Sequence, residues 1–214
     1  MAVGHTTKKL ASLNVGDSIY DIVGPLGVPT HIEKYGTVAC VAGGYGAAPC
    51  YLIAKAFKEA GNKVHMIMGA REKKLLFWEE KMKDASSELH ITTDDGSYGT
   101  KGFTTQVLDK IIKAEKVDYV IAVGPMPMMR AVAELTRGKG IKTEASMNPI
   151  MVDGTGMCGA CRLTVGGETK FACVDGPDFD GHLVDFDEVI ARTSIYKPQE
   201  KKRDENCNLL KSAK

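Results

Sequence analysis

The stretch TVACVAGGYGAAPCYLIAKAFKEAGN, residues 37–62, contains an apolar run, a glycine-rich turn and an amphipathic segment in direct succession. The apolar run 37–42 predicts a buried strand. The segment after the turn has apolar residues at helical spacing and ends at Gly61-Asn62, which predicts a helix to about Ala60. A strand, a tight turn and a helix in this order form the repeating unit of a parallel α/β sheet.

The same alternation continues along the chain. Apolar runs predict further strands at 64–68, 89–92, 119–123 and 141–144, and helices fit between them at 72–83, 103–115 and 126–137. Five strands with helical crossovers predict an α/β fold with a doubly wound five-stranded parallel sheet, which binds its ligand at the carboxyl ends of the strands. In the helix at 72–83, we expect Leu75, Leu76, Trp78 and Met82 to form a stripe that faces the core.

Four loops follow the predicted strands at that edge and carry the candidate nucleotide-binding residues. These are Gly43, Gly44 and Gly46 in the first loop, Arg71 in the second, Asp94 and Asp95 in the third, and Gly124, Pro125 and Met126 in the fourth. Glycines let the backbone approach a pyrophosphate, and a helix N-terminus favours negative charge, although such turns also serve as plain strand-to-helix connections. The acidic residue that would bind ribose hydroxyls is missing, and Arg71 stands near that point. NAD(H) and NADP(H) therefore both remain open.

A second motif, DGTGMCGACRLTVGGETKFAC, gathers four potential metal ligands: Asp153, Cys158, Cys161 and Cys173. Gly166-Gly167 predicts a type I′ hairpin turn, which sets Val165 opposite Glu168 and brings Cys173 beside Cys161. The spacing matches the C-x4-C-x2-C run of a [2Fe-2S] site, with a more distant cysteine, if Asp153 replaces the first cysteine.

The spacing alone leaves three interpretations of this motif. Thiolates also bind zinc, although structural zinc sites usually carry two paired ligand units, and a C-x2-C pair occurs in thioredoxin-type dithiols. The cluster is favoured because glycines at 154, 156 and 159 suit a loop that turns its amides toward cluster sulfurs. For Asp153, the alternative to an iron ligand is an ordinary turn aspartate beside Gly154.

Composition excludes several classes of function. Lys plus Arg is 28 and Asp plus Glu is 27, a net charge of +1, so no basic field indicates nucleic acid or a membrane surface as a partner. No apolar run approaches the roughly 20 residues of a spanning helix, and residues 1–15 do not form a secretory signal. Clustered cysteines indicate metal binding in a reducing compartment, and hence a cytoplasmic protein. Cys40 and Cys50 have no partner spacing, and Cys40 is expected to be a buried small hydrophobe.

The glycine turn at 43–49, the loops at 94–97 and 124–129, and the cysteine motif resemble, in this order, the ferredoxin reductase superfamily. More narrowly, the chain resembles the electron-transfer subunit of dihydroorotate dehydrogenase and the small subunits of NADH-dependent ferredoxin:NADP oxidoreductase and sulfide dehydrogenase. The resemblance covers residues 4 to about 196. It implies a flavin-binding barrel, an NAD-binding domain and a C-terminal [2Fe-2S] domain. It further implies a larger catalytic flavoprotein or iron-sulfur subunit as partner, with ferredoxin as a further candidate.

The resemblance also implies roles for single residues. Thr6 and Thr7 fall where relatives touch FAD, and Cys158, Cys161 and Cys173 would ligate iron. The dihydroorotate branch has cysteine at the position of Asp153, whereas the ferredoxin:NADP branch is similar to this chain. The family's arginine-containing flavin motif lies in barrel strands that this sequence lacks, so we expect a truncated gene model or a fragment.

These observations divide the chain into four expected parts. Residues 1–33 would be the last part of a flavin barrel, with a strand at 18–23; residues 34–147 the NAD-binding domain; 148–196 the [2Fe-2S] domain; and 197–214 a disordered charged tail. The expected function is that of an electron-transfer subunit between NAD(P)H, FAD and a [2Fe-2S] cluster, of the ferredoxin:NADP or sulfide dehydrogenase type. The alternatives are the dihydroorotate dehydrogenase subunit of pyrimidine biosynthesis, and a nucleotide-binding module with structural zinc.

Overall fold

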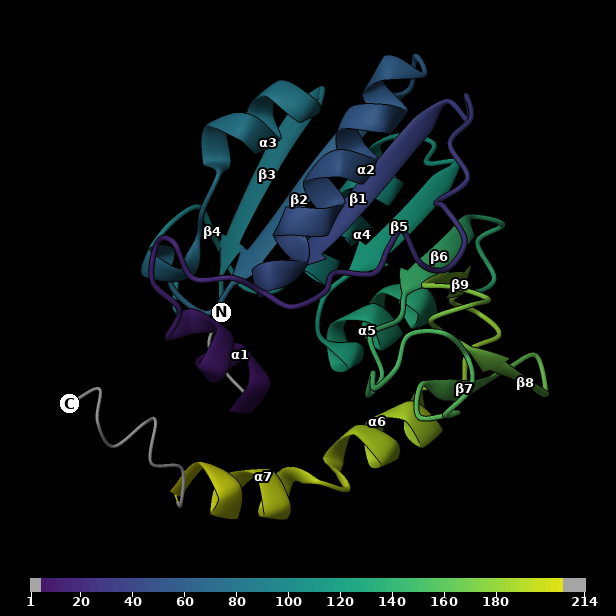
Figure 1. The fold of residues 1–214 in the computed structure, drawn as a ribbon. Coiled ribbons are helices and arrows are strands. Elements are labelled where there is room, and N and C mark those ends of the chain that lie inside the picture. The colour runs from purple at the N-terminus through teal and green to yellow at the C-terminus, as the bar shows by residue number, and fades with distance from the viewer. Residues whose placement is uncertain (1–4, 206–214) are drawn as a thin grey trace.

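The computed structural model describes residues 5–205, and its centre is a twisted, mostly parallel sheet (Figure 1). Within these residues the sheet has seven strands in the order β4-β3-β2-β1-β5-β6-β9. The strands are β1 (Thr37–Gly43), β2 (Lys63–Ala70), β3 (Glu88–Thr93), β4 (Thr100–Lys101), β5 (Tyr119–Val123), β6 (Lys142–Ser146) and β9 (Asp178–Asp180). The five predicted strands are confirmed and run parallel, whereas β4 and the antiparallel β9 extend the sheet beyond the prediction.

Helices cover both faces of the sheet and bury two hydrophobic clusters. α2 (Ala47–Glu59) and α3 (Glu79–Ala85) pack on one face, where Val38, Cys40 and Phe57 are fully buried. α4 (Thr104–Ala114) and α5 (Met126–Thr136) cover the other face, around Val41, Leu108 and Met129. The strands between them are buried on both faces, which is why they appear in the sequence as continuous apolar runs.

The helix predicted at 72–83 forms only in part, and its apolar stripe is wrong. A short 3-10 turn, η2 (Lys73–Leu75), precedes α3. Trp78, whose backbone is left-handed (φ 59°), lies between the two elements and keeps them separate. Met82 is fully buried, but Trp78 is 45% exposed, under the ammonium of Lys81. The apolar residues at helical spacing therefore belong to two separate elements.

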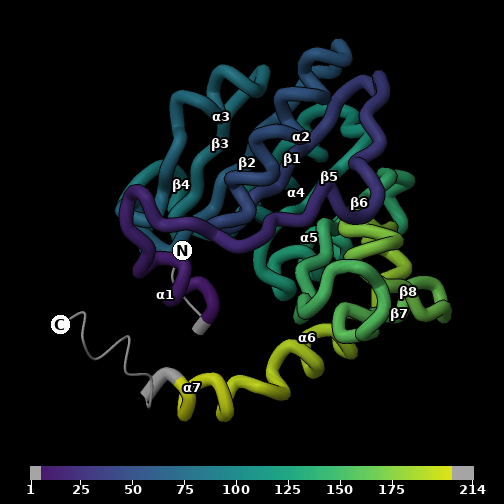
Figure 2. Tube along the Cα trace, in the orientation of Figure 1, coloured from purple at the N-terminus to yellow at the C-terminus, as the bar shows by residue number. Residues whose placement is uncertain are grey.

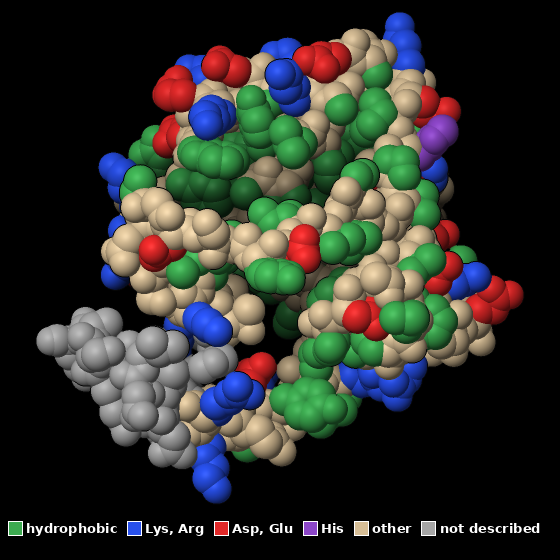
Figure 3. Space-filling model, viewed as in Figure 1, with side chains coloured by type: hydrophobic (Ala, Val, Ile, Leu, Met, Phe, Trp, Pro, Cys, Tyr) green, Lys and Arg blue, Asp and Glu red, His purple; other side chains and the backbone are tan. Residues whose placement is uncertain are grey.

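The β structure expected at the N-terminus is not confirmed. Helix α1 (His5–Ala11) is followed by an irregular segment, residues 12–36, that crosses in front of the sheet (Figure 2). The strand predicted at 18–23 lies beside no strand in the described part of the chain, and a single strand without a ladder partner is unstable. Many of its apolar side chains, such as Tyr20 and Ile22, are exposed, and hydrophobic side chains gather on this face (Figure 3).

The C-terminal part is tied to the same sheet and core. β7 (Arg162–Val165) and β8 (Glu168–Phe171) form the predicted hairpin, and α6 (Phe186–Ser194) packs on it. Leu163 and Val189 are fully buried in the cluster that also contains α5. The tail expected to be disordered forms α7 (Lys197–Glu205) in its described part, and Cys207 lies outside the described residues. Between residues 5 and 205, no helix is long and apolar enough to cross a membrane.

Candidate functional site: a nucleotide cleft beside a cysteine loop

A cleft of about 850 Å³ opens at the carboxyl ends of β1, β2, β3, β5 and β6. It is lined by all four loops that the sequence singled out. Of the predicted residues, Gly43, Gly44, Gly46, Arg71, Asp94, Gly124 and Pro125 line it. The sheet thus brings together predicted residues that are up to 82 positions apart, from Gly43 to Pro125.

The glycines of the first loop have two different physical roles. A Cβ atom on Gly46 would lie 2.1 Å from the carbonyl oxygen of Val123, so this glycine allows the first and fourth loops to pack together. Gly44 has φ +53° and open space around its Cα. Gly44 is therefore the position where bare backbone faces the cleft, which is the feature that a close-lying pyrophosphate requires.

The cleft carries partial positive charge from helix α2. This helix follows the 3-10 turn η1 (Gly44–Gly46), has Gly46 as its N-cap with no side-chain hydrogen bond, and has no acidic residue in its first turn. The N–H of Ala47 already donates to the carbonyls of Gly44 and Tyr45, and Pro49 has no N–H, so this helix end offers an anion chiefly its dipole. The Arg71 guanidinium at the end of β2 adds a full positive charge.

Four predicted binding residues are not part of the cleft lining. Met126 is 7% exposed and belongs to the core beneath the loop, and the carboxylate of Asp95 accepts a hydrogen bond from the Ser97 N–H at 2.9 Å. Hydrogen bonding from Ser97, first from its side chain and then from this N–H, lowers the pKa of Asp95. Thr6 and Thr7 lie on α1, which contacts α7.

Sequence reasoning missed several lining residues. Tyr45 and Phe103 present aromatic rings to the cleft and are more than half exposed. Ser146, Met147 and Asn148 follow β6 at the same edge. The sequence did contain a signal for Ser146, Met147 and Asn148, because they follow a predicted strand in the same way as the four loops that were singled out.

The cysteine loop, residues 153–173, has its two ends joined next to the cleft. The N–H of Met147 donates to the carbonyl of Pro177 at 2.8 Å, and both residues line the cleft. The hairpin has the predicted register, with Val165 opposite Glu168 and positive φ at Gly166 and Gly167. The segment that carries the cysteines is therefore a direct extension of the nucleotide-binding edge.

Two of the cysteines meet where the hairpin pairs its strands. Sγ of Cys161 and Sγ of Cys173 are 3.3 Å apart, as the hairpin register predicted, and both residues are buried. Cys158 is exposed at the rim, and its Sγ accepts the N–H of Ala160 at 3.4 Å. Burial raises the pKa of the Cys173 thiol, and the neighbouring Cys161 sulfur raises it further.

Asp153 lies within the same loop. Its Oδ1 accepts the N–H of Thr155 and its Oδ2 accepts the N–H of Cys158, each at 2.7 Å. These bonds, first that from Thr155, lower the pKa of Asp153 below its ordinary value. This is the contact pattern of a turn aspartate, yet each carboxylate oxygen keeps a further lone pair for a metal bond.

The donor set fits an iron-sulfur cluster. Sulfur ligands of one tetrahedral metal, at metal–sulfur distances near 2.3 Å, lie about 3.8 Å apart, so the 3.3 Å Cys161–Cys173 pair needs only a small adjustment. Gly156 has φ +88° and its amide faces the sulfur of Cys173, where it opposes the rise in pKa. A Cβ there would lie 2.7 Å from Val174 Cγ2.

The two other cysteines of the described chain lie apart from this loop. Cys40 and Cys50 are fully buried on the other side of the sheet, as expected for Cys40, and Cys50 Sγ contacts Met66 Sδ at 4.0 Å. They therefore provide matched controls for the three cysteines of the loop.

Two family models match the chain. Residues 40–134 match the oxidoreductase NAD-binding domain, and residues 148–185 match the iron-sulfur cluster binding domain of dihydroorotate dehydrogenase B. Their order and limits agree with the cleft and the cysteine loop.

Curated relatives and a solved structure resemble nearly the whole chain. It is 51% identical to the dihydroorotate dehydrogenase B (NAD(+)) electron transfer subunit homolog of Thermotoga maritima, over 93% of this chain and 70% of the relative. It is 40% identical to the probable electron transfer subunit of the same enzyme in Methanocaldococcus jannaschii, over 86% and 70%. A solved structure of an NADH-dependent reduced ferredoxin-NADP oxidoreductase, described in relation to flavin-based electron bifurcation, matches with TM-score 0.89 and 49% identity. That match covers 95% of this chain and 74% of the solved one.

Proposed function

The chain belongs to the family of the dihydroorotate dehydrogenase B electron-transfer subunit, and from this premise we propose that it carries electrons between a nicotinamide dinucleotide, a flavin and a [2Fe-2S] cluster. It is an oxidoreductase subunit with an NAD-binding domain and an iron-sulfur domain. The observation that carries the proposal is that Met147 and Pro177 both line the nucleotide cleft and close the base of the cysteine loop.

The residues of the chain have distinct tasks in this function. The backbone of Gly44 and the first turn of α2 would hold the pyrophosphate, and Arg71 would pair with a phosphate or ribose group. Cys158, Cys161 and Cys173 would ligate iron, with Asp153 as the fourth ligand. When bound, a nicotinamide supplies two electrons as a hydride, a flavin divides them, and a [2Fe-2S] centre carries them singly.

Burial of the cluster ligands has a further role. Cys161 and Cys173 lie in a hydrophobic core with Leu163 and Ala172, which limits access of water to that side of the site. Cys158 and Asp153 are exposed to solvent. The exposed side is therefore the one at which we place the exchange of electrons with a partner subunit.

We propose as partner a larger catalytic subunit, and ferredoxin as a further electron carrier. The aspartate at position 153, together with the structural match, favours a subunit of the ferredoxin:NADP type over one that serves dihydroorotate. FAD belongs to the family context, and its site would require groups other than the cleft lining described above. A cytoplasmic location is proposed because clustered cysteines that bind metal need a reducing compartment.

Iron analysis tests the proposal. Anaerobically purified protein should be brown, contain about two irons and two acid-labile sulfides per chain, and give a paramagnetic resonance signal after reduction. Cys161→Ala should remove most of this iron, whereas Cys50→Ala, which changes a buried cysteine of α2, should retain it. Asp153→Ala should change the resonance spectrum. Colourless protein with stoichiometric zinc would support the structural-zinc module instead, and an unchanged Asp153→Ala spectrum would assign Asp153 to the turn alone.

A further inference from the structure

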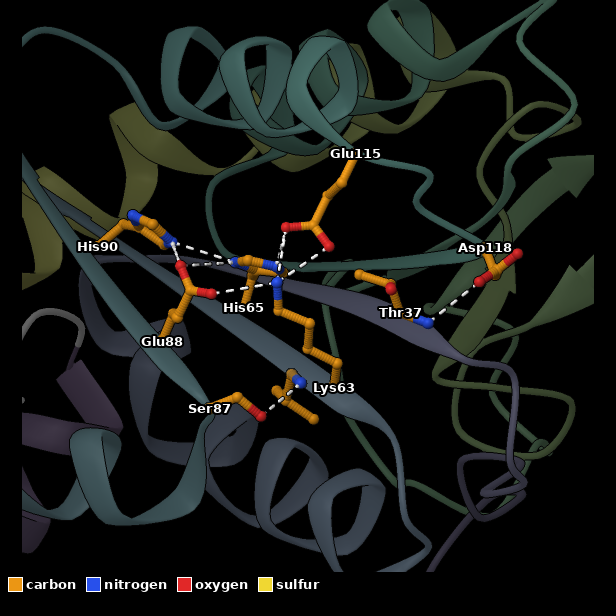
Figure 4. A network of polar contacts seen from close by, with 9 residues as sticks. Thr37, Lys63, His65, Ser87, Glu88, His90, Glu115 and Asp118 are labelled. Atoms are coloured by element: carbon orange, nitrogen blue, oxygen red, sulfur yellow. Dashed lines mark hydrogen bonds and ion pairs between the residues drawn. The ribbon is translucent and has the colours of Figure 1, made fainter.

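A cluster of charged and imidazole side chains lies at the opposite edge of the sheet from the nucleotide cleft (Figure 4). His65 is near the start of β2, and Glu88 and His90 are near the start of β3. Parallel pairing sets His65 opposite Glu88, and alternation along β3 puts His90 on the same face as Glu88. Glu115, the C-cap of α4, approaches from above. None of these residues contributes to the function proposed above.

Three potential ligand atoms of this cluster form a triangle with sides below 4 Å. Nδ1 of His65 lies 3.2 Å from Nε2 of His90, and Oε2 of Glu88 lies 3.7 Å from the first nitrogen and 3.8 Å from the second. A tetrahedral zinc with bonds of about 2.0–2.1 Å holds its nitrogen and oxygen ligands about 3.4 Å apart, so each of these separations needs a change of only a few tenths of an ångström. We propose that His65, His90 and Glu88 bind a zinc ion, as a site separate from the cysteine loop.

The second nitrogen of His65 supports this assignment. The side chain is only 2% exposed, and Nε2 has no partner with hydrogen-bonding geometry among the described residues, although Oε1 of Glu115 is 3.1 Å away. A metal on Nδ1 leaves the ring proton of His65 on Nε2. After a small rotation, the Glu115 carboxylate would accept a hydrogen bond from this N–H. A carboxylate behind a metal-binding histidine is a common supporting arrangement in zinc sites.

The charges around the triangle suit a dication. Lys63 Nζ forms ion pairs with Glu115 Oε1 at 2.7 Å and with Glu88 Oε1 at 3.1 Å. With neutral histidines, these groups carry one net negative charge.

An ion can reach this position from solvent. The triangle lies in a cleft of about 540 Å³ that is also lined by Lys110 and Ala114 of α4 and by Gly99 and Thr100. His90 is partly exposed, with 29% of its side chain accessible, so water could complete a four-coordinate zinc from the open side. The C-terminal end of α4 also contributes partial negative charge here.

Zinc binding to iron-sulfur-loaded protein tests the proposal. Titration with zinc sulfate against a chromophoric chelator should show one zinc per chain for the wild type. His90→Ala should weaken it by more than about 100-fold, and Glu115→Gln by about tenfold, since supporting carboxylates are worth 10- to 100-fold. His31→Ala is the matched control, because His31 also lies against a carboxylate, that of Glu33 at 3.2 Å, but is exposed. It should bind zinc like the wild type.

X-ray absorption of the wild type gives a readout that does not depend on variants folding. Zinc at the proposed site has nitrogen and oxygen neighbours at about 2.0–2.1 Å and no sulfur, whereas zinc in the cysteine loop has sulfur at about 2.3 Å. Failure of the wild type to bind zinc, sulfur in the zinc spectrum, or equal zinc affinity for wild type and folded His90→Ala would each overturn the proposal. Iron content stays the separate test of the electron-transfer function.

Discussion

The two edges of the central sheet, where its parallel strands end (the carboxyl edge) and where they begin (the amino edge), consist of different kinds of residues. At the carboxyl edge, the cleft is lined mainly by glycine turns, a helix N-terminus and apolar side chains, with Arg71 and Asp94 as its charged groups. At the amino edge, charged side chains face one another: Lys63 contacts Glu88 and Glu115, and Asp118 holds the start of β1 (Figure 4).

The difference separates ligand binding from stability. The carboxyl edge offers a bare glycine at position 44 and a helix N-terminus without a side-chain cap, and both can receive a ligand. Most polar groups at the amino edge are already paired within the protein, and the buried His65 Nε2 is the exception on which we base the zinc proposal. We therefore expect changes at the carboxyl edge to alter nucleotide affinity most, and changes at the amino edge to alter mainly folding stability or metal content.

The sharpest test of the carboxyl edge compares two neighbouring glycines. Gly46 has φ −59°, which alanine tolerates, but its added Cβ would lie 2.1 Å from the Val123 carbonyl oxygen. Gly44 has φ +53° and open space. Gly46→Ala should lower the free energy of unfolding by about 3 kcal/mol through overpacking and should abolish NAD(P)H binding. Gly44→Ala should cost only about 1 kcal/mol, through backbone strain alone.

Urea unfolding and fluorescence titration with NADH measure the two effects separately. If Gly44→Ala destabilised the protein more than Gly46→Ala, the close packing of the first and fourth loops would not explain the glycine at position 46.

A smaller effect is expected from the single cation at the end of β2. Arg71→Met should weaken NADPH binding by about tenfold or more, because the guanidinium can pair with a dianionic ribose phosphate, and should weaken NADH binding less. Binding constants for the two nucleotides at one salt concentration measure the ratio. Equal losses would mean that Arg71 contacts a group common to both, and an unchanged affinity for both would remove it from the site. Lys74→Met, which alters an exposed lysine paired with Glu72, provides the control.

The sequence predicted the carboxyl edge well because its signals are local. Each buried strand is a continuous apolar run, and each run is followed directly by its loop, so Gly43, Arg71 and Gly124 could be placed on one edge without knowing the strand order. The Gly166-Gly167 turn likewise determined the hairpin register and hence the Cys161–Cys173 contact. Roles of individual residues in ligand binding remain predictions, as for Asp153.

The amino edge and the N-terminal segment could not be predicted in the same way. His65 and Glu88 are 23 positions apart, and only the register between β2 and β3 brings them together. The apolar residues at 18–23 have strand-like composition, but strand formation also needs a neighbouring strand, which composition does not reveal. Trp78 matched a helical stripe, yet its left-handed backbone splits the helix.

The smallest predicted effect belongs to the amino edge and depends on pH. Oδ2 of Asp118 accepts the N–H of Thr37 at 3.0 Å, and Oδ1 contacts Lys116 Nζ at 2.5 Å. Lys116 and the Thr37 amide lower the pKa of Asp118 below 3.8. Asp118→Asn keeps an acceptor for Thr37 but removes the charge, so it should cost about 1 kcal/mol at pH 7.

The sign of the pH dependence follows from the lowered pKa of Asp118. The ionised carboxylate stabilises the folded state fully above the unfolded-state pKa, and this contribution is lost as the pH falls through the lower folded-state pKa. The difference between wild type and Asp118→Asn in urea unfolding should therefore be constant from pH 7 to about 5 and shrink below 3.8. Asp84→Asn, which changes an exposed aspartate of α3, should show little change. A difference that instead grew toward acid pH would show that Asp118 is stabilised in its protonated form, and the amino edge would then not be held by charge pairing at this residue.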